Sequence, residues 1–118
     1  MYASQMETNM QKIQFNMNKF SENLTSVQNG TSNFDDIKHA VEEVKDNLYS
    51  IYIEINTLHP PSNLITLHNT VQDGCNSYIL GIIEFLKYYS DGDDEHFITG
   101  GRKIQRGTEL MYKAADMF

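Results

Sequence analysis

Apolar side chains recur along this chain in alternating steps of three and four residues, the spacing that aligns them on one face of an α-helix. Four such runs follow one another, and short segments rich in Asn, Gly, Pro and Asp separate them. The pattern predicts helices over about residues 3–28, 34–58, 62–90 and 94–117. The connections between these helices are short, so successive helices should be antiparallel neighbours.

The residues between the runs are typical of helix ends. Asn29-Gly30 offers a glycine that can adopt the left-handed conformation common after a helix. Pro60-Pro61 ends the second run, because the residue before a proline is disfavoured in the helical region. The segment 91–94 combines a glycine with acidic residues, which suit the positive end of a helix dipole.

We therefore predict an all-α fold, with residues 1–118 forming one domain as an antiparallel up-down-up-down four-helix bundle. The competing architecture is an extended coiled-coil hairpin. The fourth run is the weakest, because it contains Gly100, Gly101 and Gly107, and each glycine costs roughly 1 kcal/mol against alanine inside a helix. We expect these small residues to let a neighbouring helix approach closely.

Composition and charge argue against several classes of protein. The net charge of -7 disfavours a broad nucleic-acid interface and charge-driven binding to an anionic membrane, since both need excess Lys and Arg. No run of about 20 apolar residues could span a bilayer, and no signal peptide is visible. Cys75 is the one cysteine, so an intramolecular disulfide is impossible, and we expect it to fill space in the core.

The sequence does not predict a metal or cofactor site. A di-iron carboxylate site needs Glu-x-x-His on two helices, and the nearest match, Asp36 to His39, has Asp in place of Glu and no second copy. The remaining histidines, His59, His68 and His96, fall at different heights on the predicted helices. We therefore expect no shared metal and no cofactor.

One histidine occupies a position that should be buried. His68 falls on the apolar face of the third predicted helix, and Tyr52 and Glu54 on the second helix lie near its height. The simpler interpretation is a neutral histidine with Tyr52 or Glu54 as hydrogen-bond partner. The alternative is a small-molecule site or pH switch between the helices, formed by His68, Glu54, Tyr52 and Tyr78.

Two aromatic residues fall outside the narrow apolar stripes. Phe15 lies opposite its neighbours Ile13 and Met17, and Tyr49 is offset from the second stripe. Exposed aromatic side chains of this kind are typical of protein contacts. Phe15 and Tyr49 are therefore our candidates for a surface that binds a protein partner or a second copy of the chain.

The second half of the chain resembles small surface lipoproteins of Gram-positive bacteria. The matching features in residues 59–118 are Pro60-Pro61, Leu67-His68, Cys75, Tyr78 and Gly81, and the ending Tyr112-Lys-Ala-Ala. The resemblance implies an exported helical domain on a lipid anchor, although this sequence shows neither the signal peptide nor the lipidated cysteine. Export and anchoring would therefore require that the native N-terminus had been trimmed; without export, the expected compartment is the cytoplasm.

A shorter segment, Tyr112 to Asp116, is similar to the tail signal of small helical type VII secretion substrates. Those substrates carry Trp-x-Gly at a turn, and this chain has no Trp.

Taken together, these patterns favour a non-enzymatic helical interaction domain, which the resemblance would place outside the cytoplasm. A ligand-binding or sensory bundle with a site near His68 is the alternative. An enzyme ranks third, because the sequence offers no nucleophile or acid–base group in a recognisable arrangement.

Overall fold

The computed structural model describes residues 1–118 and contains helices without strands, which confirms the all-α prediction. The helices are α1 (Tyr2–Gln28), α2 (Phe34–Thr57), α3 (Ile65–Asp91) and α4 (Asp94–Ala115), and a short 3-10 helix, η1 (Ser62–Leu64), precedes α3. The predicted ranges agree with these bounds to within one residue except at two ends. Residues 62–64 form the 3-10 turn instead of the start of α3, and α4 ends at Ala115.

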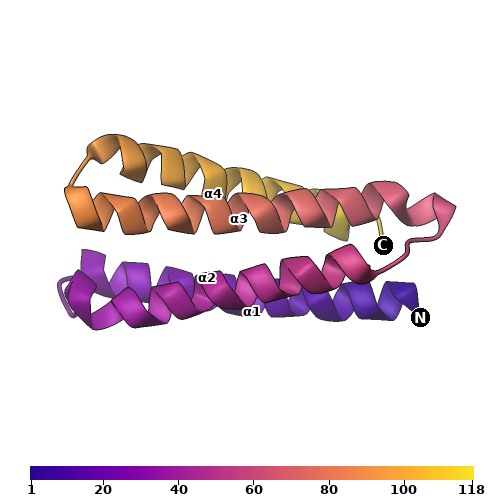
Figure 1. Cartoon of the computed structure of the whole chain (residues 1–118), viewed down its shortest axis with the longest axis horizontal. Coiled ribbons are helices and arrows are strands. Elements are labelled where there is room, and N and C mark those ends of the chain that lie inside the picture. Colours follow the sequence, from indigo (N-terminus) through magenta and orange to yellow (C-terminus); the bar gives the residue numbers. More distant parts are fainter.

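Side chains and glycines fix the helix ends. Asn33 caps α2 by accepting a hydrogen bond from the Asp36 backbone N–H at 3.0 Å, and the Asp36 carboxylate accepts one from the Asn33 N–H at 3.0 Å. Gly30 and Gly92 follow α1 and α3 with φ of 76° and 70°, a left-handed conformation that glycine adopts without steric cost. The chain reverses direction at each of these points (Figure 1).

The four helices lie lengthwise in two pairs, α1 beside α2 and α3 beside α4 (Figure 1). The molecule measures 46 × 22 × 22 Å. Extensive contacts join α1 to α2, α2 to α3 and, most closely, α3 to α4, whereas α1 and α4 make almost no contact. One side of the molecule, between α1 and α4, is therefore not closed by direct helix packing.

The helices contribute unequally to the core. Large buried side chains come from α1, α2 and α3, for example Ile13, Leu48 and Ile82, which are at most 1% exposed. In contrast, the buried residues of α4 are the small Gly100, Gly107 and Ala114. Because α4 presents small residues to α3, the two helices approach closely, and Ile104 and Met111 of α4 lie over glycines of α3.

Two glycine pairs explain the closeness of α3 and α4. A Cβ placed on Gly81 would lie 3.0 Å from the Gly100 carbonyl oxygen, and one on Gly100 would lie 3.0 Å from the Gly81 oxygen. Gly107 faces Gly74 in the same way, with its Cβ position 3.0 Å from the Gly74 oxygen. These pairs also show that α3 and α4 run antiparallel.

The expected role of the α4 glycines is thus confirmed for Gly100 and Gly107 and wrong for Gly101. A Cβ on Gly101 would meet no atom within 4 Å, because this residue points away from α3. The sequence shows that Gly100 and Gly101 are adjacent, but it does not show which of the two faces α3.

Candidate functional site: a groove between α1 and α4

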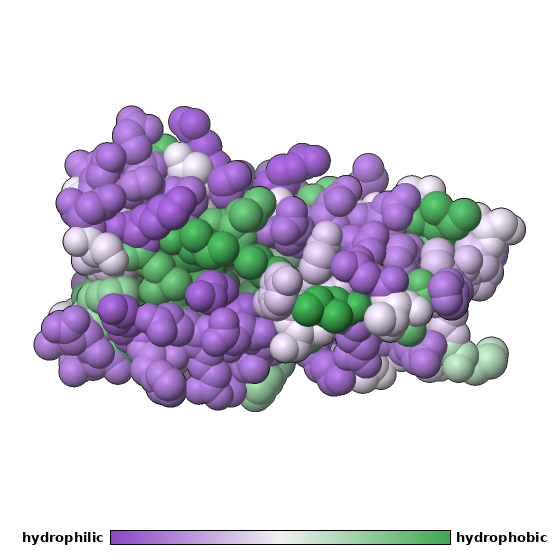
Figure 2. Space-filling view, in the orientation of Figure 1, coloured by the Kyte–Doolittle hydropathy of each residue, from purple (hydrophilic) through white to green (hydrophobic).

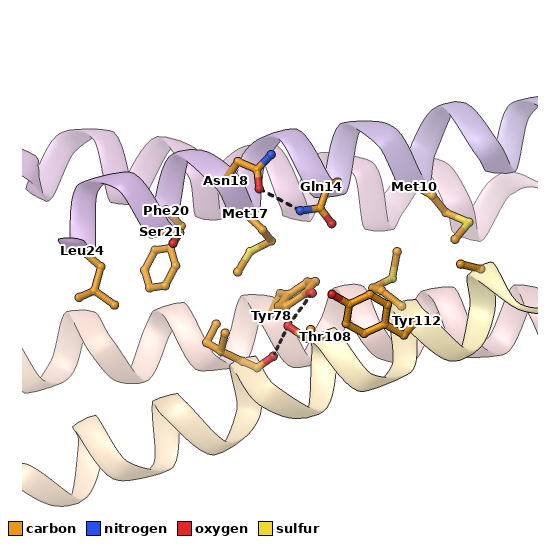
Figure 3. A pocket seen from close by; sticks show the side chains of 13 residues that line it. Met10, Gln14, Met17, Asn18, Phe20, Ser21, Leu24, Tyr78, Thr108 and Tyr112 are labelled. Atoms are coloured by element: carbon orange, nitrogen blue, oxygen red, sulfur yellow. Dashed lines mark hydrogen bonds between the residues drawn. The ribbon is translucent and has the colours of Figure 1, made fainter. Parts of the chain in front are cut away.

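A large cavity lies along the open side. It is a groove of about 470 Å³ with 13 lining residues, 9 of them hydrophobic. Figure 3 shows side chains from α1 on one wall facing those from α3 and α4 on the other. We call it the α1–α4 groove, lined by Met10, Gln14, Met17, Asn18, Phe20, Ser21 and Leu24 of α1, Tyr78 of α3, and Ile104, Thr108, Met111, Tyr112 and Ala115 of α4.

The groove has a buried floor and an accessible rim. Phe20 and Tyr78 are each 4% exposed and form part of the floor. Tyr112, at 72% exposed, lies on the α4 rim, and Gln14 and Asn18 lie exposed on the α1 rim. An incoming apolar group could therefore reach the floor from solvent and lose its own contact with water there.

The polar groups in the groove are neutral, and most satisfy one another. The Thr108 hydroxyl donates to the Ile104 carbonyl at 3.2 Å, so it accepts from the Tyr78 hydroxyl, 3.0 Å away. Burial raises the pKa of Tyr78 above its ordinary value, which keeps the phenol protonated. On the rim, the Gln14 amide donates to Asn18 Oδ1 at 2.9 Å (Figure 3).

The chemistry of this lining suits apolar binding. No charged residue lines the groove, although charged residues make up 21% of the chain. Met10, Met17 and Met111 contribute flexible thioether side chains, which adapt their shape to different apolar surfaces. The lining therefore offers apolar and neutral polar contacts to whatever enters the groove.

The predicted hydrogen-bond partners of His68 are wrong. His68 is buried at 7% exposed, but its Nδ1 bonds the Tyr2 hydroxyl at 2.8 Å. Tyr52 and Glu54 were chosen by height on α2, whereas the first turn of α1 reaches the first turn of α3 at the same end of the molecule (Figure 1). Burial lowers the pKa of His68, in agreement with a neutral imidazole.

The other three residues of the predicted ligand site lie in different surroundings. Glu54 is 54% exposed and pairs with Lys12 of α1 at 3.9 Å. Tyr52 is half-buried against the core. Of the four residues, Tyr78 alone lines the α1–α4 groove, so the structure does not bring His68, Glu54, Tyr52 and Tyr78 together around that cavity.

Phe15 and Tyr49 are both exposed, at 59% and 56%, but they do not form one surface. The Lys19 ammonium lies 4.6 Å from the centre of the Phe15 ring on α1. Tyr49 lies one turn from Lys45, which lines a shallow pocket between α2 and α3. They are therefore candidates for two separate contacts.

The α2–α3 side of the molecule is mostly hydrophilic. Figure 2 shows this surface, with an apolar patch between the two helix pairs surrounded by polar residues. Ile83 and Leu86 are the hydrophobic residues of the shallow pocket there, and charged residues such as Lys38 and Glu42 form most of its lining. The shallow pocket on this side has two hydrophobic lining residues, against nine in the α1–α4 groove.

The other groups with potential chemistry have structural contacts. Cys75 is buried, and burial raises the pKa of its thiol to about 12, so it is a poor nucleophile at neutral pH. His96 lies between two acids of α3, with Nδ1 2.7 Å from Glu84 and Nε2 3.1 Å from Asp91. No group of three or more His, Cys, Asp or Glu residues is arranged to hold a metal ion.

Sequence reasoning did not identify the groove, although it placed most of its apolar residues on helix faces. One available signal was the seven-residue spacing of Gly74 and Gly81, which matches that of Gly100 and Gly107. Two helices with matched small residues should pack closer to each other than to other neighbours. The pattern could thus have indicated a tight α3–α4 pair and an open side.

No family model, curated protein or solved structure matches this chain. None of the helices combines the length and apolar content needed to cross a bilayer.

Proposed function

We propose that this protein is a non-enzymatic helical interaction domain: an antiparallel up-down-up-down four-helix bundle, open between α1 and α4, that binds apolar side chains of a protein partner in the α1–α4 groove. The observation that carries the proposal is the groove itself, an accessible cavity of about 470 Å³ with an apolar floor and an uncharged lining. Its volume falls within the range of about 300–1,000 Å³ typical of small-molecule pockets, which is also enough space for apolar side chains of a partner.

Energetic considerations support a protein partner. Binding energy at protein interfaces is concentrated in a few anchor side chains that fill desolvated pockets. Each Leu-sized side chain that leaves water contributes about 1.5–3 kcal/mol. Several such anchors along the groove would offset a substantial part of the cost of association, about 4–15 kcal/mol.

The test uses a helical peptide with leucine on one face and glutamine on the other, labelled for fluorescence anisotropy. The variant Ser21→Lys/Ala115→Lys places two charges at exposed positions of the groove lining. We expect the wild type to bind the peptide and this variant to bind at least tenfold more weakly, since an ammonium group disfavours apolar contact.

The matched control is Ala3→Lys/Ser50→Lys, which adds the same charges at exposed helix positions outside the groove. It should bind like the wild type, and both variants should keep the helical circular dichroism of the wild type. Equal peptide binding by both variants, or none by the wild type, would contradict the proposal.

Phe15 and Tyr49 remain two further predicted contact sites within the same function. Each is exposed singly, which is common on ordinary protein surfaces. Phe15→Ser should leave peptide binding in the groove unchanged and weaken any contact made by the outer face of α1. A setting at the surface of a Gram-positive cell belongs to the same proposal and rests on the resemblance of residues 59–118 to surface lipoproteins.

A further inference from the structure

Building on the proposed interaction function, we infer that the partner of the α1–α4 groove is a basic amphipathic helix of about four turns. The inference rests on three features: the charges that flank the groove, its length and its apolar floor.

The α1 side of the groove is flanked by acidic residues. Glu7 lies two turns before Gln14, and Glu22 lies one turn after Asn18. Both glutamates therefore lie on the same side of α1 as these rim residues. Both glutamates are exposed. A partner lying in the groove would therefore pass close to their carboxylates.

The α4 side carries acidic residues as well. Glu109 lies one turn before Tyr112, the exposed rim residue, and Asp116 lies one turn after it. Both are exposed. Arg102, Arg106 and Lys113 are exposed on the same flank of α4, within one or two turns of Glu109, so the charge beyond the rim is negative on α1 and mixed on α4.

The lysines of α1 lie on the other side of that helix. Lys12 pairs with Glu54 of α2, and Lys19 lines a small pocket between α1 and α2. On α4, Arg106 lies one turn before Glu109 and Lys113 one turn after it, so the acidic flank of α1 carries most of the preference for a basic partner. The chain as a whole carries a net charge of -7, which reinforces attraction of a basic partner.

The length of the groove matches a helix. From Met10 to Leu24 it follows α1 for about 21 Å at 1.5 Å per residue, or roughly four turns. A partner helix with apolar residues at positions i, i+3 or i+4, and i+7 would place one anchor per turn over this distance. The flexible side chains of Met10, Met17 and Met111 could adjust to such anchors.

A second copy of this chain fits less well. Each copy carries a net charge of -7, and the approach of two surfaces with the same charge is unfavourable. Self-association through this groove is therefore an outcome that would contradict the inference.

The experiment compares three peptides with the same leucine face and with Lys, Gln or Glu on the polar face. At about 0.05 M salt, we expect the Lys peptide to bind the wild type at least tenfold more tightly than the Glu peptide, with the Gln peptide between them. At about 0.5 M salt the difference should shrink severalfold, because screening shortens the reach of exposed charges.

Variants in which glutamine replaces glutamate test which carboxylates cause the preference for the Lys peptide. The triple variant Glu7→Gln/Glu22→Gln/Glu109→Gln should bind the Lys peptide about fivefold more weakly and the Gln peptide unchanged. The matched control, Glu42→Gln/Glu43→Gln/Glu54→Gln, removes the same charge from α2 and should bind both peptides like the wild type.

The outcomes separate the two proposals. If the Gln peptide binds in a manner sensitive to Ser21→Lys/Ala115→Lys but the Lys and Glu peptides bind equally, the groove function stands and the basic partner is wrong. If no peptide binds, both are wrong. If sedimentation shows a dimer of the chain that Ser21→Lys/Ala115→Lys dissociates, the occupant is a second copy, and the inference is overturned.

Discussion

Asn9 is the residue whose burial is hardest to justify by stability alone. It is 2% exposed, and its side-chain carbonyl has no hydrogen-bond partner. A buried polar atom left unpaired costs about 1–3 kcal/mol. Asn16, two turns later, differs because its carbonyl accepts a hydrogen bond from Asn47 of α2 at 3.1 Å.

We therefore expect Asn9→Leu to raise the free energy of unfolding by about 1 kcal/mol and the melting temperature by a few degrees. Asn16→Leu is the matched control and should give a smaller gain or a loss, because it removes the bond to Asn47. Thermal unfolding followed by circular dichroism measures both. A destabilised Asn9→Leu would show that this amide has a partner or a role that its surroundings do not reveal.

At this scale the sequence predicted burial better than hydrogen bonding. The period of the third run placed His68 and Cys75 in the core, where both are found. The Tyr2 partner of His68 could not be found by the same reasoning, because it depends on how the first turn of α1 approaches α3 across the bundle. A helical period describes one helix and carries no information about such diagonal contacts.

At the scale of helices, the tight α3–α4 contact depends on the absence of side chains at Gly107 and its partners. A Cβ on Gly107 would lie 2.7 Å from the Tyr78 ring and 3.0 Å from the Gly74 carbonyl oxygen. The backbone oxygen cannot move without moving α3. Crowding of this kind typically costs about 1–3 kcal/mol.

We predict that Gly107→Ala lowers the free energy of unfolding by about 1–3 kcal/mol. Gly101→Ala, where the new methyl meets nothing within 4 Å, should instead raise it by about 0.5–1 kcal/mol, because alanine is favoured inside a helix. Urea unfolding of the two variants measures this difference in sign. A loss of stability in both, or a gain in both, would contradict the assigned packing.

We predict that the stability contributed by His96, near the junction of α3 and α4, depends on pH. The hydrogen bond to Glu84, aided by attraction to Asp91, raises the pKa of His96 above its ordinary 6.5. The folded protein therefore holds this proton more tightly than the unfolded chain does. The resulting stabilisation is complete below about pH 6.5 and is lost as the pH rises through the raised pKa.

His96→Gln should accordingly reduce the free energy of unfolding more at about pH 5.5 than at about pH 8.5. Comparing the variant with the wild type at each pH cancels the effect of His68, whose lowered pKa acts in the opposite direction in both proteins. A difference between variant and wild type that does not change with pH would show that the ion pairs of His96 do not contribute.

The helices themselves were largely predictable. Their ends depend on local residues such as Gly30, Asn33 and Pro60, and the apolar period is also a local property. The closeness of α3 to α4 was less accessible, because Gly100 and Gly101 differ in sequence position by one residue and in orientation by about 100° around the helix. Only the position of α3 shows which of them makes the contact.

At the scale of the whole molecule, the open side follows from unequal spacing among the helices. The α3–α4 contact buries glycines, while α1 packs mainly on α2. The groove is what remains between α1 and α4, lined by apolar residues that a closed bundle would bury. The sequence could not indicate this cavity directly, because the same apolar faces would suit a closed bundle.

The central claim is that a partner helix binds in this groove, and the most direct test is an NMR titration of the labelled protein with the glutamine-faced peptide. We predict the largest shift changes in the methionine methyl groups of Met10, Met17 and Met111 and in amides near Ser21 and Thr108, which line opposite walls of the groove. Changes concentrated instead around Phe15, or around Tyr49 and Ile53 on α2, would contradict the account.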